Sequence, residues 1–267
     1  MKNRIQAHGT CLESSPRSLR ASHGSLRASH GAALLEPSAA DECTLFAPLH
    51  YEANYAYPLI VWLHGAGESD RVLTRIMPHV SLRNYAAVAP RGTQPSRRAS
   101  RIDGATAAFG WRQTTEQIYT AQVRVANAIE KAAAELTIHR QRIFLAGSGC
   151  GGTMALRVAM DNPNRYAGAL SLDGSFPRGG APLQRLVEAR QIPLFIARAR
   201  KSKAYGSEIA CDDLRLLYAA GMSLTLKEYP GADVCRPQVL GDIDRWIMEV
   251  LAEQTQAPVV ASSRRVS

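Results

Sequence analysis

Short apolar runs alternate with longer amphipathic stretches through most of the chain, and this alternation limits the available folds more than any other feature. The runs have strand length and little polar character; they are Leu59–Leu63, Tyr85–Ala89, Ile143–Ala146, Tyr166–Leu172, Leu194–Ala197 and Ser223–Leu226. The stretches have helical spacing of apolar residues; they are Arg71–Val80, Glu116–Leu136, Thr153–Met160, Leu183–Arg190, Glu208–Ala220 and Val239–Leu251. Apolar strands are buried on both faces, so the sequence predicts an α/β fold with a doubly wound, mostly parallel sheet and helices on both faces.

Two shorter runs precede this alternation. Thr44–Pro48 and Glu52–Tyr57 have strand-like composition, and we expect them to supply an antiparallel edge to the sheet. Together with the later elements they define a folded domain over residues 41–252. An apolar share of 46% in 267 residues is sufficient for one core of that size without disulfides or metal.

Both ends of the chain differ from the domain. Residues 1–40 are rich in Ser, Ala, His and Arg, and they contain Ser-Leu-Arg-Ala-Ser-His-Gly at Ser18–Gly24 and again at Ser25–Gly31. Two seven-residue copies are too few and too short for a repeat fold. We therefore interpret residues 1–40 as a disordered basic tail, and residues 253–267 as a second disordered tail.

Several classes of protein are disfavoured by composition. No apolar run is long enough to cross a bilayer, and Met1–Gly9 lacks the apolar region of a secretory signal. The five cysteines are odd in number and have no paired spacing, which favours reduced thiols in a cytoplasm. Neither a metal-ligand pattern nor a cofactor motif is evident: the glycine-rich segment Gly147–Gly152 lacks the Lys-Ser/Thr pair of a nucleotide-binding loop.

Two motifs are more specific. Val61–Glu68 is a strand that ends in His-Gly-Ala-Gly, and Arg142–Leu156 is a strand, a glycine-rich turn and a helix. The C-terminal segments that accompany them are Pro193–Ala197, Gly221–Gly231 and Asp242–Met248. Together these segments resemble the α/β-hydrolase fold, and most closely its phospholipase/carboxylesterase branch, which is dienelactone-hydrolase-like. The resemblance implies a serine ester hydrolase with a nucleophile, an acid and a histidine in that chain order.

The residues that this resemblance assigns to the triad are unsuited to it. The family's nucleophile follows the pattern Gly-x-Ser-x-Gly-Gly, which places Gly149 in the nucleophile position. Ser148 or Cys150 would take that position only if the preceding strand were one residue shorter or longer. A one-residue slip reverses every side chain of a strand, so these two residues stay as fallback nucleophiles.

The other two triad positions are also altered. The acid position falls at Ser202, and the histidine position falls at Asp233 in Pro-Gly-Ala-Asp. No histidine follows His139, and His64 belongs to the His-Gly turn, where its expected task is structural. A serine hydroxyl without a base is a weak nucleophile. The resemblance nevertheless implies that the N–H groups of Ala66 and Cys150 still form an oxyanion hole.

Of the net charge of +9, the two tails carry +4 and the domain +5, and the excess of the domain is concentrated in two loops. The loop 91–114 carries five Arg and one Asp, and the loop 198–208 carries two Arg, two Lys and one Glu. Both follow predicted strands, which places them at the carboxyl edge of the sheet, where open α/β folds bind ligands. We expect four arginines to rim a pocket for an anionic ligand: Arg91, Arg112, Arg198 and Arg200.

The absence of a basic helix argues against reading of a DNA groove, although solvated arginine loops remain the plain alternative. The sequence therefore predicts an ester-hydrolase-like chain with a degenerate triad, a pseudoenzyme that binds a small anionic ligand or a protein partner. Two alternatives stay open. One is an active carboxylesterase or thioesterase that uses Ser148 or Cys150, and the other is an interaction scaffold without a ligand.

Overall fold

The computed structural model describes residues 34–35, 43–96 and 108–256 of the chain. The strands of the described residues are β1 (Leu34–Leu35), β2 (Cys43–Phe46), β3 (Tyr57–Leu63), β4 (Ala86–Pro90), β5 (Gln94–Ser96), β6 (Ala108–Gly110), β7 (Ile138–Ser148), β8 (Gly168–Leu172), β9 (Leu194–Ala199) and β10 (Leu224–Tyr229). The α-helices are α1 (Leu73–Val80), α2 (Thr115–Glu135), α3 (Cys150–Asp161), α4 (Leu186–Ala189), α5 (Ser207–Ala219) and α6 (Pro237–Gln256).

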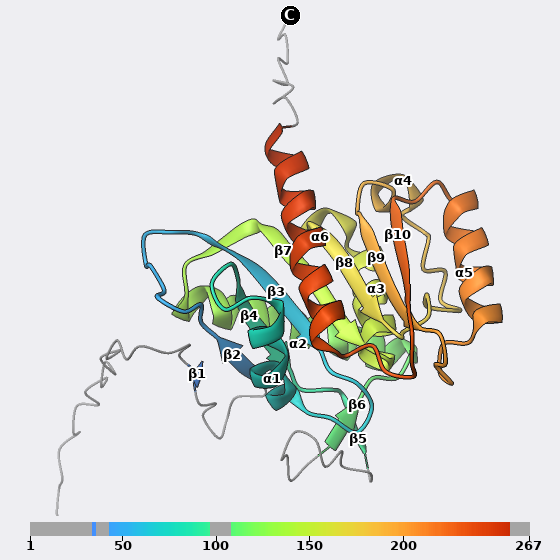
Figure 1. Ribbon diagram of the computed structural model, residues 1–267, viewed down its shortest axis with the longest axis horizontal. Helices are drawn as coiled ribbons and strands as arrows, with labels where there is room; N and C mark the ends of the chain where they lie inside the picture. The colour runs from blue at the N-terminus through green and yellow to red at the C-terminus, as the bar shows by residue number, and fades with distance from the viewer. Residues whose placement is uncertain (1–33, 36–42, 97–107, 257–267) are drawn as a thin grey trace, which may run out of the picture.

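One sheet organises the domain (Figure 1). Its strand order is β1-β2-β4-β3-β7-β8-β9-β10, and the strands from β4 to β10 run parallel to one another. β1 and β2 are antiparallel to their neighbours. The predicted doubly wound, mostly parallel α/β sheet is therefore confirmed. Because the strands are parallel, the loops after β3, β4, β7, β8, β9 and β10 meet at one edge of the sheet.

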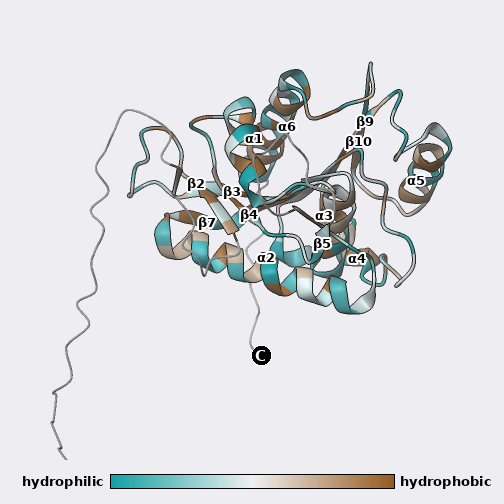
Figure 2. Ribbon diagram, turned by 90° about the horizontal axis from the view of Figure 1, so that it is seen from below, coloured by the Kyte–Doolittle hydropathy of each residue, from teal (hydrophilic) through white to brown (hydrophobic). Residues whose placement is uncertain are grey.

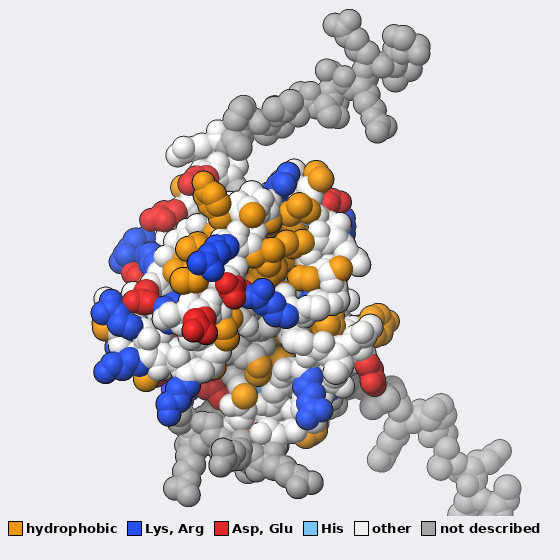
Figure 3. Space-filling model, turned by 90° about the vertical axis from the view of Figure 1, so that its right-hand side faces the viewer, with side chains coloured by type: hydrophobic (Ala, Val, Ile, Leu, Met, Phe, Trp, Pro, Cys, Tyr) orange, Lys and Arg blue, Asp and Glu red, His pale blue; other side chains and the backbone are white. Residues whose placement is uncertain are grey.

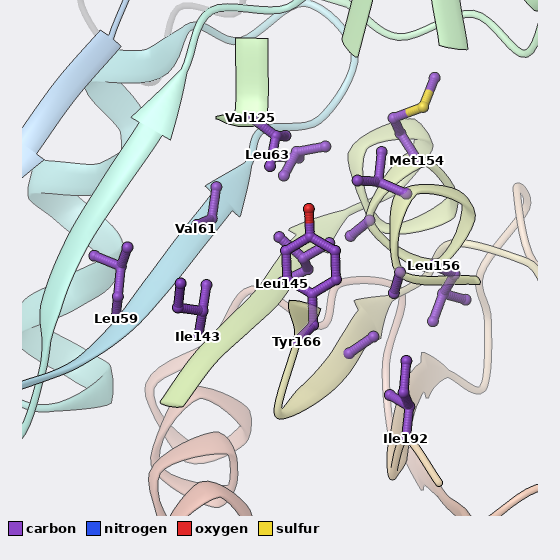
Figure 4. Packing of buried hydrophobic residues seen from close by; sticks show 14 of the residues in the cluster. Leu59, Val61, Leu63, Val125, Ile143, Leu145, Met154, Leu156, Tyr166 and Ile192 are labelled. Atoms are coloured by element: carbon purple, nitrogen blue, oxygen red, sulfur yellow. The ribbon is translucent and has the colours of Figure 1, made fainter. Parts of the chain in front are cut away.

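Helices cover both faces of this sheet (Figure 2). Leu59, Val61 and Leu63 of β3 pack toward α2 and α3, whereas Ile60 and Trp62 pack toward α1 and α6. This alternation is the two-residue period of a strand, here with apolar side chains on both sides because both sides are buried. Figure 4 shows the α2–α3 side of the core, where β3 and β7 contribute neighbouring side chains.

The antiparallel edge is only partly as predicted. The Thr44–Pro48 run corresponds to β2, which pairs with β4 in the expected antiparallel sense. The expectation of a strand at Glu52–Tyr57 is wrong, because only Tyr57 is extended and it starts β3. Two tyrosines that gave this segment strand-like composition, Tyr55 and Tyr57, instead meet edge to face, with ring centroids 4.7 Å apart.

Two other boundaries differ from the prediction. The expected helix Leu183–Arg190 is reduced to the four residues of α4: Arg185, just before it, is not helical (φ −103°, ψ 49°), and Val187 faces solvent. The strand expected at Ile143–Ala146 is longer in the structure: β7 begins at Ile138, and its residues 139–142 are polar. β5 and β6, which pair antiparallel in a two-stranded ribbon, were not expected.

The ends of the domain are longer than the sequence indicated. Leu34–Leu35, inside the segment interpreted as a tail, forms β1 on β2. At the other end α6 continues to Gln256, into the second segment interpreted as a tail. The tandem copy at 18–31 and residues 257–267 lie outside the described residues. Among the helices of the described ranges, none combines the length and apolar character needed to cross a membrane.

Candidate functional site

A sharp turn at Gly149 joins the central strand to the helix that follows it. Gly149 has φ 52° and ψ −122°, a conformation that residues with a side chain rarely adopt. Its N–H donates to the carbonyl of Leu172 at 2.8 Å, which ties the turn to β8. A Cβ at Gly149 would meet no atom within 4 Å. The position that the resemblance assigned to the nucleophile therefore faces open space and holds no side chain.

The residues after the turn allow α3 to lie directly on β3. A Cβ at Gly151 would lie 2.2 Å from the carbonyl oxygen of Leu63 and 2.3 Å from that of His64, far inside contact distance. Only glycine fits this close approach. The glycine spacing thus has a packing cause of its own: it brings the first N–H groups of α3 against the loop that follows β3.

Ser148 and Cys150 flank the turn on either side. Ser148 is the last residue of β7, and it is buried. Its hydroxyl is hydrogen-bonded to the thiol of Cys235, and this bond lowers the thiol's pKa, but burial outweighs it and raises the pKa of Cys235 to about 12. Burial also raises the pKa of the half-buried Cys150 thiol. Neither cysteine is therefore poised as a thiolate at neutral pH.

The two residues that the resemblance assigns to an oxyanion hole, Ala66 and Cys150, both lie near Gly110. A Cβ at Gly110, on β6, would be 3.8 Å from the Cys150 sulfur and 3.9 Å from the Ala66 Cα. The 66–68 loop is held to β6 by hydrogen bonds of 2.8 Å from Gly67 N–H to Phe109 and from Phe109 N–H to Glu68. Cys150 is the first residue of α3, and its N–H has no acceptor within the helix. These N–H groups suit a carbonyl or carboxylate oxygen.

The acid side of the site contains a carboxylate that the sequence analysis missed. Asp173 follows β8, has φ 53°, and accepts a 2.7 Å hydrogen bond from the N–H of Ala199. The Ser202 hydroxyl is hydrogen-bonded to it, and the charge of Asp233 acts on it; burial and Asp233 together raise the pKa of Asp173. The structure thus brings Ser202 and Asp233 together around Asp173. The position of Asp173 directly after the strand next to the elbow is the sequence feature that could have identified it.

His64 has a structural environment. Its ring is completely buried, its Nε2 accepts a hydrogen bond from the N–H of Gly92 at 2.9 Å, and its Nδ1 lies 2.9 Å from the carbonyl of Gly65. Trp111 donates from its indole N–H to the His64 carbonyl at 3.1 Å. These bonds assign the ring proton to Nδ1 and leave neither nitrogen able to take a proton from a nucleophile.

Three of the four predicted rim arginines have carboxylate partners. Arg91 pairs with the buried Asp70, at 3.2 Å. Arg198, which is itself buried, and Arg200 both pair with Glu228 on β10. The mixture of acidic and basic side chains on the face that carries β10 and α5 is visible in Figure 3. Arg112 is exposed and no carboxylate of the described residues pairs with it. The other arginines of the 91–114 loop lie outside the described residues.

Metal binding has no evident basis here: in the described part of the chain, no group of three or more His, Cys, Asp or Glu side chains is placed to hold an ion.

The comparisons with known proteins agree with the fold. The crystal structure of Arabidopsis thaliana SOBER1 has a TM-score of 0.61 and 21% identity to this chain, covering 73% of this chain and 100% of that one. The Bacillus cereus carboxylesterase has a TM-score of 0.62 and 17% identity, with coverages of 79% and 95%. A carboxylesterase from Mesorhizobium loti has a TM-score of 0.61 and 16% identity, with coverages of 82% and 99%.

Identities this low establish a shared fold only. The sequence profile described as Phospholipase/Carboxylesterase matches residues 50–232, which is more than half of the chain and includes the His-Gly turn, the elbow and the loop that ends in Gly231. The chain therefore belongs to the phospholipase/carboxylesterase family of α/β-hydrolase-fold proteins.

Proposed function

We propose that this chain is a pseudoenzyme of its family, which binds a small carboxylate or carbonyl compound at the elbow and does not hydrolyse it. Gly149 carries the proposal. The turn has the backbone conformation of an elbow and open space beside its Cα, but no atom that can attack an ester. A ligand can occupy that space.

The general base is the second part of the argument. The position for histidine holds Asp233, whose carboxylate accepts from the N–H of Cys235 at 2.8 Å. Both ring nitrogens of His64 are engaged by backbone groups. Removal of a base costs a serine hydrolase several orders of magnitude in rate, so a hydroxyl near this elbow has little means of activation.

The alternative of an active ester hydrolase requires Ser148 or Cys150 as nucleophile. Ser148 is buried and bonded to Cys235, and burial disfavours the thiolate of Cys150. Both observations count against the alternative, because an attacking hydroxyl needs a base and an attacking thiol needs to be ionised.

Ligand recognition would use the donors that remain. Ala66 and Cys150 both lie near Gly110, and the exposed Arg112 is two residues from Gly110 in the chain. The other rim arginines already balance Asp70 and Glu228. We therefore assign the oxyanion donors and Arg112 to an anionic or carbonyl group. A protein partner is the other occupant to be tested.

A p-nitrophenyl ester panel tests the loss of catalysis. We expect no burst and no turnover above buffer, and no labelling by a fluorophosphonate probe. Ser148→Ala and Cys150→Ala are the matched variants: hydrolysis by the wild type that either one abolishes would show that the chain is an enzyme and would refute the pseudoenzyme proposal.

A thermal-shift series with acetate, butyrate and benzoate at constant ionic strength tests binding. We expect saturable stabilisation that Arg112→Gln weakens about tenfold, because a charge-assisted hydrogen bond is lost. Arg83→Gln removes another exposed arginine far from the elbow and should change nothing. Equal binding by both variants would exclude Arg112 from the site. Absence of stabilisation by every compound would refute the small-ligand form of the proposal. The protein-partner form is then tested by a pull-down that compares the wild type with a variant substituted beside Gly149.

A further inference from the structure

A second cleft lies away from the elbow, between the first half of α2, the end of α3 and the loop before α4. It encloses about 420 Å³. Its lining residues are Thr115, Ile118, Tyr119, Gln122, Arg157, Met160, Asp161, Asn162, Gly180, Pro182, Gln184 and Arg185. None of them belongs to the elbow site. Most are polar, which is unusual for a gap between two helices that otherwise meet through apolar side chains.

Arg157 is the feature that calls for an explanation. It lies on α3, is 1% exposed, and is among the largest fully buried side chains of the described residues. Its Nε donates to Gln113 at 3.2 Å and one terminal nitrogen donates to the carbonyl of Arg178 at 2.8 Å. The other terminal nitrogen, Nη1, is buried and has no hydrogen-bond partner. A buried cation with an unused donor is costly and is normally satisfied by an acceptor.

The unused nitrogen faces the wall of the cleft. A Cβ at Gly180, a lining residue, would lie 3.4 Å from Nη1 of Arg157, so the wall between the guanidinium and the cleft is bare backbone at this point. Gly180 has φ 59°, between Gly179 at 66° and Ala181 at 43°. This left-handed run keeps side chains away from the guanidinium. Nη1 itself is closed off from solvent, so an oxygen in the cleft contacts it once the backbone at Gly180 shifts aside.

Other groups at the same end favour negative charge. The first residue of α2, Thr115, lines the cleft, and its N-cap, Thr114, makes no side-chain hydrogen bond to the helix. The N–H groups at the start of this 21-residue helix and the positive end of its dipole are therefore directed to that end. Arg185 adds a half-exposed cation at the rim, although it also contacts Glu188 at 3.3 Å.

One helical turn further along α3 from Arg157, the lining of the cleft has different chemistry. Asp161 accepts a hydrogen bond of 2.7 Å from the side chain of Gln122. Burial raises the pKa of Asp161, and the charge of Arg157 opposes that rise. This part of the lining offers amide and carboxyl groups to hydroxyl groups, while Arg157 offers donors and also interacts with the charge of Asp161.

We propose that this cleft is a second binding site, specific for a small hydroxylated oxyanion whose phosphate or carboxylate group lies against Arg157, Gly180 and the N-terminus of α2. The anion supplies the acceptor that Nη1 lacks, and its hydroxyl groups meet Gln122 and Asp161. The site is independent of the elbow, since it shares none of its residues with it.

Calorimetric titration with inorganic phosphate, glycerol phosphate and glycerate, at constant ionic strength, tests this site and separates phosphate from carboxylate. We expect saturable binding that is tighter for the two hydroxylated compounds than for inorganic phosphate. Arg157→Lys keeps a charge but loses the planar donor set, and it should weaken binding about tenfold. Because Arg157 is buried, the thermal stability of this variant is measured in parallel.

Two exposed arginines give a comparison that does not depend on a buried substitution. Arg185 lines the cleft and contacts Glu188, whereas Arg215 makes the same kind of helical ion pair with Asp212 elsewhere. Arg185→Gln should weaken binding several-fold and Arg215→Gln should not. Binding unchanged by both Arg157→Lys and Arg185→Gln would overturn the proposal. Binding that only Arg112→Gln weakens would place the anion at the elbow and overturn it equally, as would no saturable binding of any compound.

Discussion

The Nε2 of His64 accepts a hydrogen bond of 2.9 Å from the backbone N–H of Gly92, which joins the loop after β3 to the loop after β4. Since Nδ1 lies at the same distance from the carbonyl of Gly65, the imidazole is fixed between two backbone segments and buried from water. It organises the loop after β3 and is not available as a base. A base for any chemistry at Gly149 has to come from a different residue.

Reinstalling two triad residues tests that conclusion. We expect the double variant Gly149→Ser with Asp233→His to bind a fluorophosphonate covalently and to release a burst of p-nitrophenol. Gly149→Ser alone should be at least about a hundredfold slower, since a general base contributes roughly that factor or more. The open space around Gly149 accommodates the new side chain without a contact.

The control for this experiment is Gly149→Ser with Asp233→Asn, which removes the same carboxylate without adding an imidazole. Equal rates in the histidine and asparagine double variants would contradict the assignment of position 233. The positive φ of Gly149 makes a side chain there costly, on the order of 1–3 kcal/mol, so unfolding curves accompany the kinetics.

The described cysteines should differ widely in reactivity. The pKa of Cys235 is raised to about 12, so at about pH 8 its thiolate fraction is roughly a thousandfold below that of an ordinary exposed thiol. Cys211 is exposed. We expect iodoacetamide to alkylate Cys211 first and Cys235 last, as read by peptide mass mapping. The rate at Cys235 should rise about tenfold per pH unit up to about pH 10, and a rate that is flat with pH would contradict this environment.

Asp173 should make stability depend on pH in a defined direction. Burial and the charge of Asp233 raise its pKa in the folded protein, so the folded state holds this proton more tightly than the unfolded chain does. Its contribution to stability is complete below the unfolded pKa of about 3.9 and is lost as the pH rises through the folded value.

Asp173→Asn removes that dependence. Asparagine keeps the acceptor for Ala199 and tolerates the φ of 53°. In urea unfolding between about pH 4 and about pH 7, the free energy of unfolding of the variant should rise relative to wild type as the pH increases. The exposed Asp212→Asn is the control. A difference that falls with increasing pH would have the wrong sign.

Glu228 should stabilise the folded protein through its ion pairs with two of the rim arginines. It pairs with the buried Arg198 and with the exposed Arg200. Glu228→Gln leaves a buried cation without its counter-charge, so we expect a lower melting temperature. Added phosphate should restore part of it in the variant and little in the wild type, because an anion can replace the carboxylate. Rescue of equal size in the wild type, or none in the variant, would show that anions do not reach Arg198.

Two glycines give a matched test of the packing at the elbow. Gly151→Ala should destabilise by more than about 3 kcal/mol, since the methyl group would overlap the carbonyl of Leu63. Gly241 lies inside α6 with nothing within 4 Å of its Cβ position. Gly241→Ala should therefore stabilise by up to about 1 kcal/mol through helix propensity. Chemical denaturation of both variants measures the contrast, and similar effects from the two would refute the close-contact explanation.

The sheet could be predicted because its strands are apolar on both faces, as in β3, and such a run is visible within a few consecutive residues. What could not be predicted depends on contacts distant in the chain. The ribbon of β5 and β6 is short and joins the 66–68 loop through Phe109. Tyr55 packs edge to face against Tyr57, although the composition of its segment is typical of a strand. Local composition contains neither contact.

The same division applies to the site. The turn at Gly149 followed from its flanking glycines, whereas the ion pairs of Arg91 and Arg198 did not, because Asp70 and Glu228 belong to other elements and pair only after folding. Asp173 was not predicted because the resemblance places the acid in the loop after β9, at Ser202. A carboxylate after β8 needed only the strand boundary to be noticed.

The backbone of Gly149 has one more consequence, for how such a turn changes over generations. Any other residue in that conformation destabilises the folded state, by on the order of 1–3 kcal/mol, and is retained where its side chain is needed for chemistry. Glycine occupies the turn without that penalty. A mutation from a side chain to glycine there therefore gains stability, and the reverse mutation loses it whether or not the other catalytic residues are present. Stability alone therefore favours glycine at this turn, and only selection for a side chain there acts against it.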